Sequence, residues 1–253
     1  MIVNLAYSFN LTFDKSIQNH YFTLRVTPRA TPYYKMYDFE TNDYLFHTID
    51  GFGNIISFGD LKGSHTSFGI ITKAKFQFTN SYYDTDNILF RHLYLSESEF
   101  VRFSPLFKDF VKDIENINDL KSFVFSLVNM IFDGFVFERG ITSVDSTINT
   151  LLEYKKGVCQ DFAHLLIAVL RYYRIPARYV SGFVTGEGES HAWVEYFDGQ
   201  VWLGADPTHN ILITNEPYIK IAHGRDAHDT SMNKGVFSGL ANQKLSVSTI
   251  MEQ

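Results

Sequence analysis

Hydrophobic and polar residues alternate along two stretches in the first third of the chain, YFTLRV at residues 21–26 and ITKAKFQF at residues 71–78. A period of two with one apolar face is typical of half-buried antiparallel strands. The dipeptides Asp50-Gly51 and Gly53-Asn54 supply turn residues between further apolar segments. We therefore expect an antiparallel β-sandwich-like domain over residues 1–95. The positions expected on its apolar faces are Phe22, Leu24, Val26, Thr72, Ala74, Phe76 and Phe78.

After residue 95 the hydrophobic period changes to that of helices. Apolar residues recur three and four positions apart in residues 118–132 and 144–154, and in a third segment that begins at Cys159. The third helix should end before Pro176, because a residue that precedes proline avoids the helical conformation. The order of elements predicts an α+β fold, in which a second domain over residues 96–253 packs a helix bundle on an antiparallel sheet. The segments expected as its strands are 177–184, 191–197, 200–206 and 244–250.

Composition and charge exclude several classes of protein. Of the 253 residues, 45% are hydrophobic, so the chain can bury a large core. A net charge of −6 without any basic cluster argues against a nucleic-acid partner. No segment approaches the roughly 20 apolar residues of a membrane span, and the first residues lack the pattern of a signal peptide. One cysteine cannot form an internal disulfide, so we expect a cytoplasmic protein without a membrane partner.

The single cysteine, Cys159, stands in KKGVCQDFAH at the expected start of a helix. The free N–H groups and the dipole of a helix N-terminus favour a nearby negative charge, and the thiolate is the nucleophilic form of cysteine. The backbone N–H of Cys159 would also suit an oxyanion donor. The alternative is an inert small hydrophobic residue, a common role of an isolated cysteine.

A hairpin is expected around Asp198-Gly199, because this dipeptide favours two-residue turns. Such a turn places His191 directly opposite Asp206 on one face of the sheet. A carboxylate there fixes the tautomer of the imidazole and stabilises imidazolium, which in turn stabilises a nearby thiolate. The alternatives are a histidine without a role in catalysis and an Asp206 that only closes an Asx turn.

Two residues are predicted to contact a substrate. The same register pairs Trp193 with Gly204, so the indole would lie beside an open space next to His191. Gly157 precedes the nucleophile, where it would let the chain turn into the helix and leave room for a substrate.

Other motifs give no pattern of a cofactor site. HGRDAHD at residues 223–229 offers possible metal ligands, but their spacing fits no known ligand pattern. DTDN at residues 84–87 lacks the glycine and glutamate of a calcium loop, and no glycine-rich phosphate loop is present. We predict no metal and no cofactor, and we expect Asp161 to complement the N-terminus of its helix.

The order and context of these segments resemble the bacterial transglutaminase-like superfamily, whose members include transglutaminase-like cysteine proteases. The resemblance rests first on GVCQDFAHLLIAVLR followed by IPARYVSGFV, on SHAWVEYF and on DPTHN. LRVTPR, DGFGNIISF, GRDAHD and GVFSG extend it over nearly the whole chain. The resemblance implies a papain-like α+β core with Cys159 as nucleophile, His191 as base and acid, and Asp206 as the residue that orients His191.

Two positions depart from the pattern of the superfamily. Arg174 stands before IPAR where relatives usually have glycine, so this helix end is expected to differ. Phe137 ends FVF where relatives often have tyrosine, so a hydroxyl group is missing.

We therefore predict cysteine-dependent amide-bond chemistry on a peptide or protein substrate, through an acyl-thioester on Cys159. Hydrolysis would make the protein a peptidase or amidase, whereas transfer to an amine would make it a transglutaminase. Two other hypotheses are a non-catalytic interaction protein on the same fold and metal-dependent hydrolysis through residues 223–229.

Overall fold

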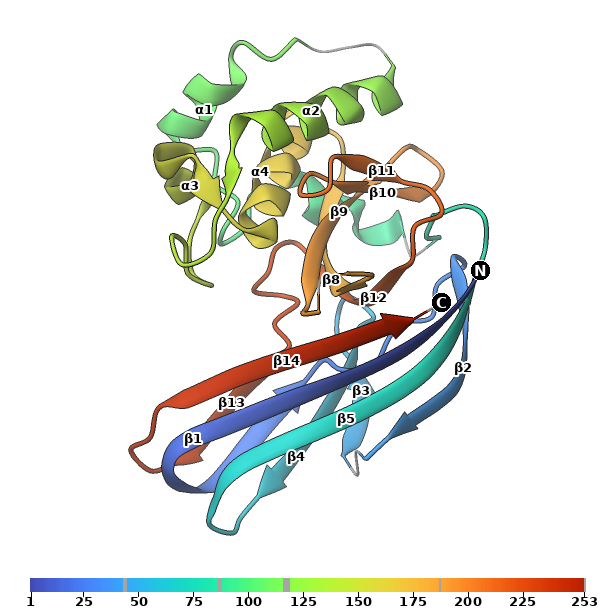
Figure 1. Cartoon of the computed structure of the whole chain (residues 1–253). Helices are drawn as coiled ribbons and strands as arrows, with labels where there is room; N and C mark the ends of the chain where they lie inside the picture. The colour runs from blue at the N-terminus through green and yellow to red at the C-terminus, as the bar shows by residue number, and fades with distance from the viewer. Residues whose placement is uncertain (43–44, 86–87, 116–118, 187, 253) are drawn as a thin grey trace.

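Three layers are stacked in the molecule (Figure 1): a group of helices, a five-stranded sheet, and a larger set of strands that extends away from them. The computed structural model describes residues 1–42, 45–85, 88–115, 119–186 and 188–252. The larger set of strands contains both N- and C-terminal segments of the chain. The five-stranded sheet lies between this set and the helices, so its two faces have different environments.

The larger sheet is built around one long strand, β1 (Ile2–Leu24). The first half of β1 pairs with β5 and β14, whereas its second half pairs with β4 and β13. The pairing with β5 becomes irregular between Thr12 and Ile17, where β1 bends back on itself (Figure 1). The bend gives the strands a sandwich-like arrangement. The other strands of this sheet are β2 (Tyr34–Thr41), β3 (Phe46–Ile49), β4 (Ile55–Leu61), β5 (His65–Phe78), β13 (Asn233–Ser238) and β14 (Gln243–Glu252).

Alternation along these strands agrees with the sequence pattern. The positions expected on the apolar faces of residues 21–26 and 71–78 are all buried. Residues 50–54 form the predicted turn between β3 and β4, in which the Gly53 N–H donates to the carbonyl of Asp50 at 2.9 Å. Gly53 has φ +79°, a conformation that glycine adopts at little cost.

The last two strands return to the N-terminal sheet. A division at residue 96 groups β13 and β14 with the second domain, but both pair with β1. A single boundary along the chain therefore does not separate the strands of the two sheets. The physical reason is that alternation within residues 244–250 predicts a strand but carries no information about its distant partner.

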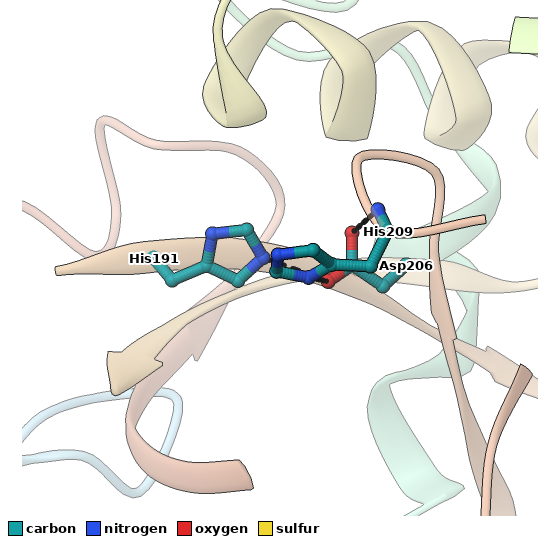
Figure 2. A group of neighbouring side chains, drawn as sticks. All are labelled: His191, Asp206 and His209. Atoms are coloured by element: carbon teal, nitrogen blue, oxygen red, sulfur yellow. Dashed lines mark hydrogen bonds and ion pairs between the residues drawn. The ribbon is translucent and has the colours of Figure 1, made fainter. Parts of the chain in front are cut away.

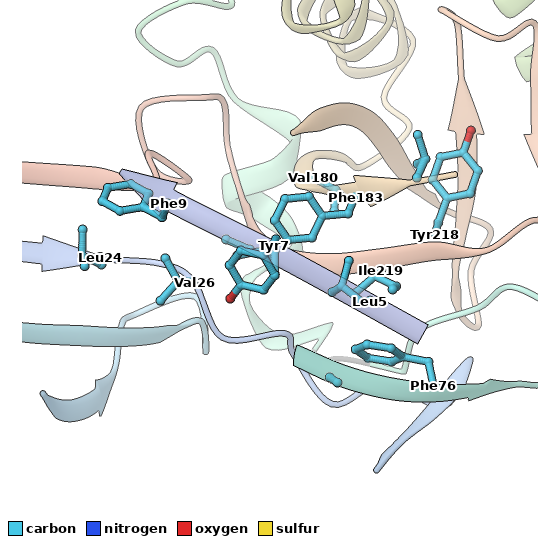
Figure 3. Packing of buried hydrophobic residues seen from close by; sticks show 14 of the residues in the cluster. Leu5, Tyr7, Phe9, Leu24, Val26, Phe76, Val180, Phe183, Tyr218 and Ile219 are labelled. Carbon is cyan, nitrogen blue, oxygen red and sulfur yellow. The ribbon is translucent and has the colours of Figure 1, made fainter. Parts of the chain in front are cut away.

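The five-stranded sheet has the order β11-β10-β9-β8-β12. Tyr179 and Val194 pack against the helices, whereas their neighbours Val180 and Trp193 join the cluster formed with β1 (Figure 3). Both faces are thus buried, and the side chains of β8, β9 and β12 are buried throughout. The strands are β8 (Ala177–Val184), β9 (His191–Phe197), β10 (Trp202–Asp206), β11 (Ile211–Ile213) and β12 (Tyr218–Gly224).

The helices appear where the period predicts them. One face of α2 is buried, with Phe123, Val124, Leu127, Val128 and Ile131. The Asp119 carboxylate caps its start by accepting the N–H of Ser122 at 2.8 Å. The helix predicted to begin at Cys159 does so and ends at Tyr172, before Pro176. No helix in the described ranges is long and apolar enough to cross a membrane. The helices and their short strands are η1 (Ile88–Leu95), α1 (Pro105–Val111), α2 (Leu120–Gly134), β6 (Val136–Phe137), α3 (Ile148–Tyr154), β7 (Lys156–Gly157) and α4 (Cys159–Tyr172).

Candidate active site

Cys159 is the first residue of α4, and its side chain is partly exposed. The start of α4 is held by Asp161, whose carboxylate accepts the backbone N–H of Val158 at 2.8 Å and the hydroxyl of Thr142 at 2.7 Å. Burial raises the pKa of Asp161. This carboxylate therefore stabilises the helix N-terminus, as expected, and the chain presents a thiol at a fixed position on the surface.

Gly157 has a packing role that differs from the predicted one. A Cβ atom at this position would lie 2.8 Å from Oδ2 of Asp161 and 3.0 Å from a methyl group of Leu151. Gly157 is itself buried. Glycine is therefore required here because the capping carboxylate packs directly against the backbone. Its predicted contact with a substrate stays a prediction.

The hairpin that carries His191 and Asp206 has a different turn from the predicted one. Phe197 pairs with Trp202, so residues 198–201 form the turn. The Asp198 carboxylate holds this turn by accepting the N–H groups of the two residues before Trp202, each at 2.8 Å. The predicted two-residue turn is therefore wrong, and His191 and Asp206 are not direct cross-strand partners.

His191 and Asp206 nevertheless meet. The register differs from the predicted one by an even number of residues, so both side chains stay on the same face of the sheet. They become diagonal neighbours, and long side chains can reach across that separation. His191 Nε2 lies 2.7 Å from Asp206 Oδ2, and both side chains are buried (Figure 2).

Asp206 lies at the centre of a group of hydrogen-bond donors. Besides His191, its Oδ2 accepts the hydroxyl of Tyr218 at 2.7 Å and bonds Nδ1 of His209 at 2.7 Å. Its Oδ1 accepts the backbone N–H of Thr208 at 2.8 Å, which closes the Asx turn. Burial alone would raise the pKa of Asp206, but the hydrogen bonds and charges of His191 and His209 hold it well below its usual range. Asp206 is thus a stable carboxylate and also closes the turn.

The second ring nitrogen of His191, Nδ1, is not bonded to Asp206. Nδ1 is buried and has no ordinary hydrogen-bond partner in the described part of the chain. Because Nε2 is occupied by Asp206, the interaction of the ring with the Cys159 thiol involves Nδ1. Burial lowers the pKa of His191, but the hydrogen bond and charge of Asp206, together with the nearby Cys159 thiol, raise it to about 10. The site therefore favours a protonated imidazole beside the thiol.

Trp193 does not line an open space. Its side chain is fully buried, and its indole N–H donates to the hydroxyl of Tyr82 at 2.9 Å. Gly204, its expected partner, lies opposite Glu195 instead. The expectation of an indole beside an open space is wrong, because the shifted register and the second packed face of the sheet enclose it.

A buried network of charges lies on the same face of the sheet as Trp193. Arg178 and Lys220 bond the carboxylates of Glu195 and Asp84 at 2.6–3.0 Å, and all four side chains are buried. The hydroxyl of Tyr82 donates to Glu195 at 2.6 Å. This network joins the segment after β5 to strands β8, β9 and β12.

Among the described residues, two groups of side chains have the composition of metal ligands. The ligand atoms of His191, Asp206 and His209 lie within 4.8 Å of one another, as do those of Asp84, Glu195 and His223. In the second group the carboxylates already bond Arg178 and Lys220, so cations of the chain occupy the place of an ion.

The segment 223–229 does not gather its side chains into one site. His223 Nε2 lies 3.2 Å from Arg178, and Asp229 forms an ion pair with Arg225 at 2.8 Å. Asp226 accepts the backbone N–H groups of Phe100 and His228. The metal hypothesis for this segment loses its support, because its carboxylates bond arginine and backbone groups.

His209 and Tyr218 were not predicted as parts of the site. His209 lies three residues after Asp206 in the same turn, so its closeness to the carboxylate could have been inferred from DPTHN. Tyr218 is on β12, and no local pattern relates it to Asp206.

Comparisons with known proteins agree with this geometry. The model of the Transglutaminase-like superfamily matches residues 108–207, which include Cys159, His191 and Asp206. An uncharacterised protein of Mycobacterium leprae is 43% identical over 118 residues, which are 43% of this chain and 42% of the relative. A protein-glutamine gamma-glutamyltransferase of Pseudomonas aeruginosa is 35% identical over 91 residues, 31% of this chain and 14% of the relative. The chain thus spans less than half the length of these curated relatives.

A solved structure extends the likeness to the whole fold. A candidate cysteine protease from Cytophaga hutchinsonii superposes with a TM-score of 0.79 at 21% identity, over 100% of this chain and 91% of that one. Residues 108–207 thus match the transglutaminase-like superfamily, and the fold of the whole chain is similar to that of the solved structure. The predicted α+β class, with a transglutaminase-like core, is confirmed.

Proposed function

We propose that the protein is a cysteine-dependent enzyme of amide-bond chemistry, most simply a peptidase or amidase that acts on a peptide or protein. The observation that carries the proposal is the placement of His191. One ring nitrogen bonds a buried carboxylate at 2.7 Å, which leaves the other for the thiol of Cys159 at a helix N-terminus. This is the arrangement that activates a cysteine nucleophile.

The reaction follows from the positions of these groups. The proton of the Cys159 thiol is held by His191 as an imidazolium, and the resulting Cys159 thiolate attacks the carbonyl carbon of the substrate. The backbone N–H of Cys159, at the start of α4, is suited to bond the resulting oxyanion. His191 gives its proton to the leaving amine as the C–N bond breaks, which leaves an acyl-thioester on Cys159. In hydrolysis, water attacks the thioester, His191 takes its proton, and the acid and free thiol are released.

Asp206 keeps His191 in the form that this cycle needs. A carboxylate that accepts Nε2–H fixes the tautomer in which Nδ1 is available to the thiol. It also stabilises the imidazolium formed when the proton moves.

Transfer to an amine is the second candidate function. It is favoured by the similarity of 91 residues to a protein-glutamine gamma-glutamyltransferase. In that reaction a lysine-type amine attacks the thioester in place of water, and the residues on the enzyme stay the same. The substrate in the first step would then be a glutamine side chain.

The test is to capture the acyl-enzyme. The protein is incubated with a peptide library, with and without a labelled primary amine, and its intact mass is measured by mass spectrometry. Wild type should gain the mass of an acyl group, and Cys159→Ala should gain none. His191→Ala should slow adduct formation by at least about 100-fold, the low end for loss of a general base.

Each outcome of this experiment decides between hypotheses. Label incorporated into the peptide supports transglutamination, whereas release of the free acid supports hydrolysis. Turnover that survives Cys159→Ala and is lost to a chelator would overturn the proposal in favour of metal-dependent hydrolysis. A wild-type protein with neither adduct nor enhanced thiol reactivity would instead be a binding module.

A further inference from the structure

We infer that His209 is a positioning residue of this site. It shares the Asp206 carboxylate with His191, and it holds that carboxylate and the His191 ring in the orientation that faces Cys159. The inference rests on the proposed function, since it assigns His209 a role in the same reaction. His209 acts through Asp206 and His191, whose side chains it contacts.

The two imidazole rings meet at one oxygen atom. His209 Nδ1 and His191 Nε2 each lie 2.7 Å from Oδ2 of Asp206 (Figure 2). The rings also pack against each other, with centroids 4.8 Å apart and planes inclined by 36°. His209 therefore limits both the rotation of the carboxylate and the tilt of the catalytic imidazole.

The side chain of His209 does more than the turn requires. The Asx turn is closed by backbone N–H groups of Thr208 and His209, which bond Oδ1 at 2.8 and 3.3 Å. Any residue except proline at position 209 would supply that backbone donor. The imidazole is directed separately to Oδ2, the oxygen that faces His191.

Asp206 and His191 lie in the interior of the protein, whereas His209 lies nearer the surface. The side chains of Asp206 and His191 are 0% and 1% exposed, whereas that of His209 is 36% exposed. His209 therefore adds little to the buried core. Its removal should change the geometry of the site more than the stability of the fold.

The protonation of His209 follows from its partner. An ionised carboxylate can only accept hydrogen bonds, so His209 must carry its proton on Nδ1 when it bonds Asp206. The hydroxyl of Tyr218 donates to the same oxygen at 2.7 Å. His191, His209 and Tyr218 thus surround Oδ2, and loss of one donor weakens the constraint on the orientation of the carboxylate.

The test compares two amides of different reach. The amide nitrogen of His209→Asn lies where Nδ1 lies in histidine and can keep the bond to Asp206, whereas that of His209→Gln lies near Nε2 and cannot. We expect His209→Gln and His209→Ala to lower kcat about tenfold with KM nearly unchanged, the effect of losing one charge-assisted hydrogen bond. We expect His209→Asn to stay within about twofold to threefold of wild type, less than the loss of one such bond.

Alkylation of Cys159 by iodoacetamide supplies a readout that needs no substrate. Its rate at pH 6 should fall in His209→Gln and His209→Ala but not in His209→Asn, because it depends on the imidazolium beside the thiol. His228→Asn and His228→Gln are matched controls, since His228 is half exposed and pairs with Glu99 away from the site. Both controls should behave as wild type.

Two results would overturn the inference: wild-type kcat and alkylation in His209→Gln, or an equal loss in His209→Asn and His209→Gln. Thermal unfolding of each variant excludes a loss due to misfolding. Failure of the proposed function would give a different result, namely turnover that persists in Cys159→Ala. The alkylation rates of Cys159 would still report the position of His191 in that case.

Discussion

At the scale of single residues, the site depends on one carboxylate oxygen that serves several donors. Oδ2 of Asp206 bonds His191, His209 and Tyr218, and the carboxylate is completely buried. A buried charge is tolerated only when it is well hydrogen-bonded, and this one is. The same bonds determine the charge of His191, which can be measured directly.

The titration of His191 is the prediction at this scale. Its raised pKa means that the charge contributes stability fully below about pH 6.5, the ordinary value, and that this contribution is lost as pH rises through about 10. An imidazole NMR titration should show one histidine, absent in His191→Ala, that titrates near pH 10. Asp206→Asn should move its midpoint to lower pH, because the carboxylate is a main cause of the shift. A titration midpoint near pH 6.5 in wild type would contradict the prediction that His191 is protonated at neutral pH.

At the scale of elements, the end of α4 has a strained residue. The N–H of Arg174 bonds the carbonyl of Arg171 at 3.0 Å, and the N–H of Ile175 bonds that of Leu170 at 2.9 Å. This is a Schellman motif, whose closing residue favours glycine. Arg174 occupies that place with φ +64°, so the helix end keeps the conformation that glycine favours, and the expected difference is not seen.

Replacing this residue should stabilise the protein. The left-handed conformation costs a residue with a Cβ about 1–2 kcal/mol, and glycine loses about 0.5–1 kcal/mol more entropy on folding. Arg174→Gly should therefore raise the free energy of unfolding by about 0.5–1 kcal/mol, measured by urea denaturation. Arg174→Ala is the control, because it removes the exposed side chain and keeps the strain. Equal stability of the two variants would show that the strain is absent.

At the scale of the whole molecule, the buried charges connect the two sheets. Asp84 follows the large sheet in the chain, whereas Arg178, Glu195 and Lys220 belong to the five-stranded sheet. Burial acts to raise the pKa values of Asp84 and Glu195, but Lys220 and Arg178 lower both. These depressed pKa values make the stability of the interface depend on pH.

The direction of this pH dependence is the prediction at the scale of the whole molecule. A depressed carboxyl pKa contributes stability above the ordinary value, near 4, and the contribution is lost as pH falls further. Glu195→Gln should destabilise the protein by about 3 kcal/mol at pH 7, because it breaks a buried ion pair, and by less at pH 3. Urea denaturation at both pH values is the measurement. The control is Glu153→Gln, at an exposed carboxylate, which should change the free energy of unfolding by less than about 0.5 kcal/mol. If Glu195→Gln and Glu153→Gln had equal effects, the buried network would not stabilise the protein.

Several helices and strands, and the place of Cys159 at a helix start, could be predicted from the sequence because their signals are local. The helix that begins at Cys159 and the strands 177–184 and 191–197 follow from the spacing of apolar residues within each segment. The turn at 198–201 was misjudged because the Asp198 side chain can close a longer turn than Asp198-Gly199 favours. Tyr218 and the network around Glu195 depend on contacts between distant strands, and a single sequence holds no record of them.

The pairing of β1 with β14 has a consequence for how the protein is made. As the chain leaves the ribosome, β1 can pair with β5 early, but its other edge waits for residues 243–252. At ordinary synthesis rates that interval is on the order of ten seconds. During this time the apolar side chains of β1 lie beside an open strand edge, the feature that leads nascent chains to aggregate. The newly made protein should therefore depend on chaperones until its last strand arrives.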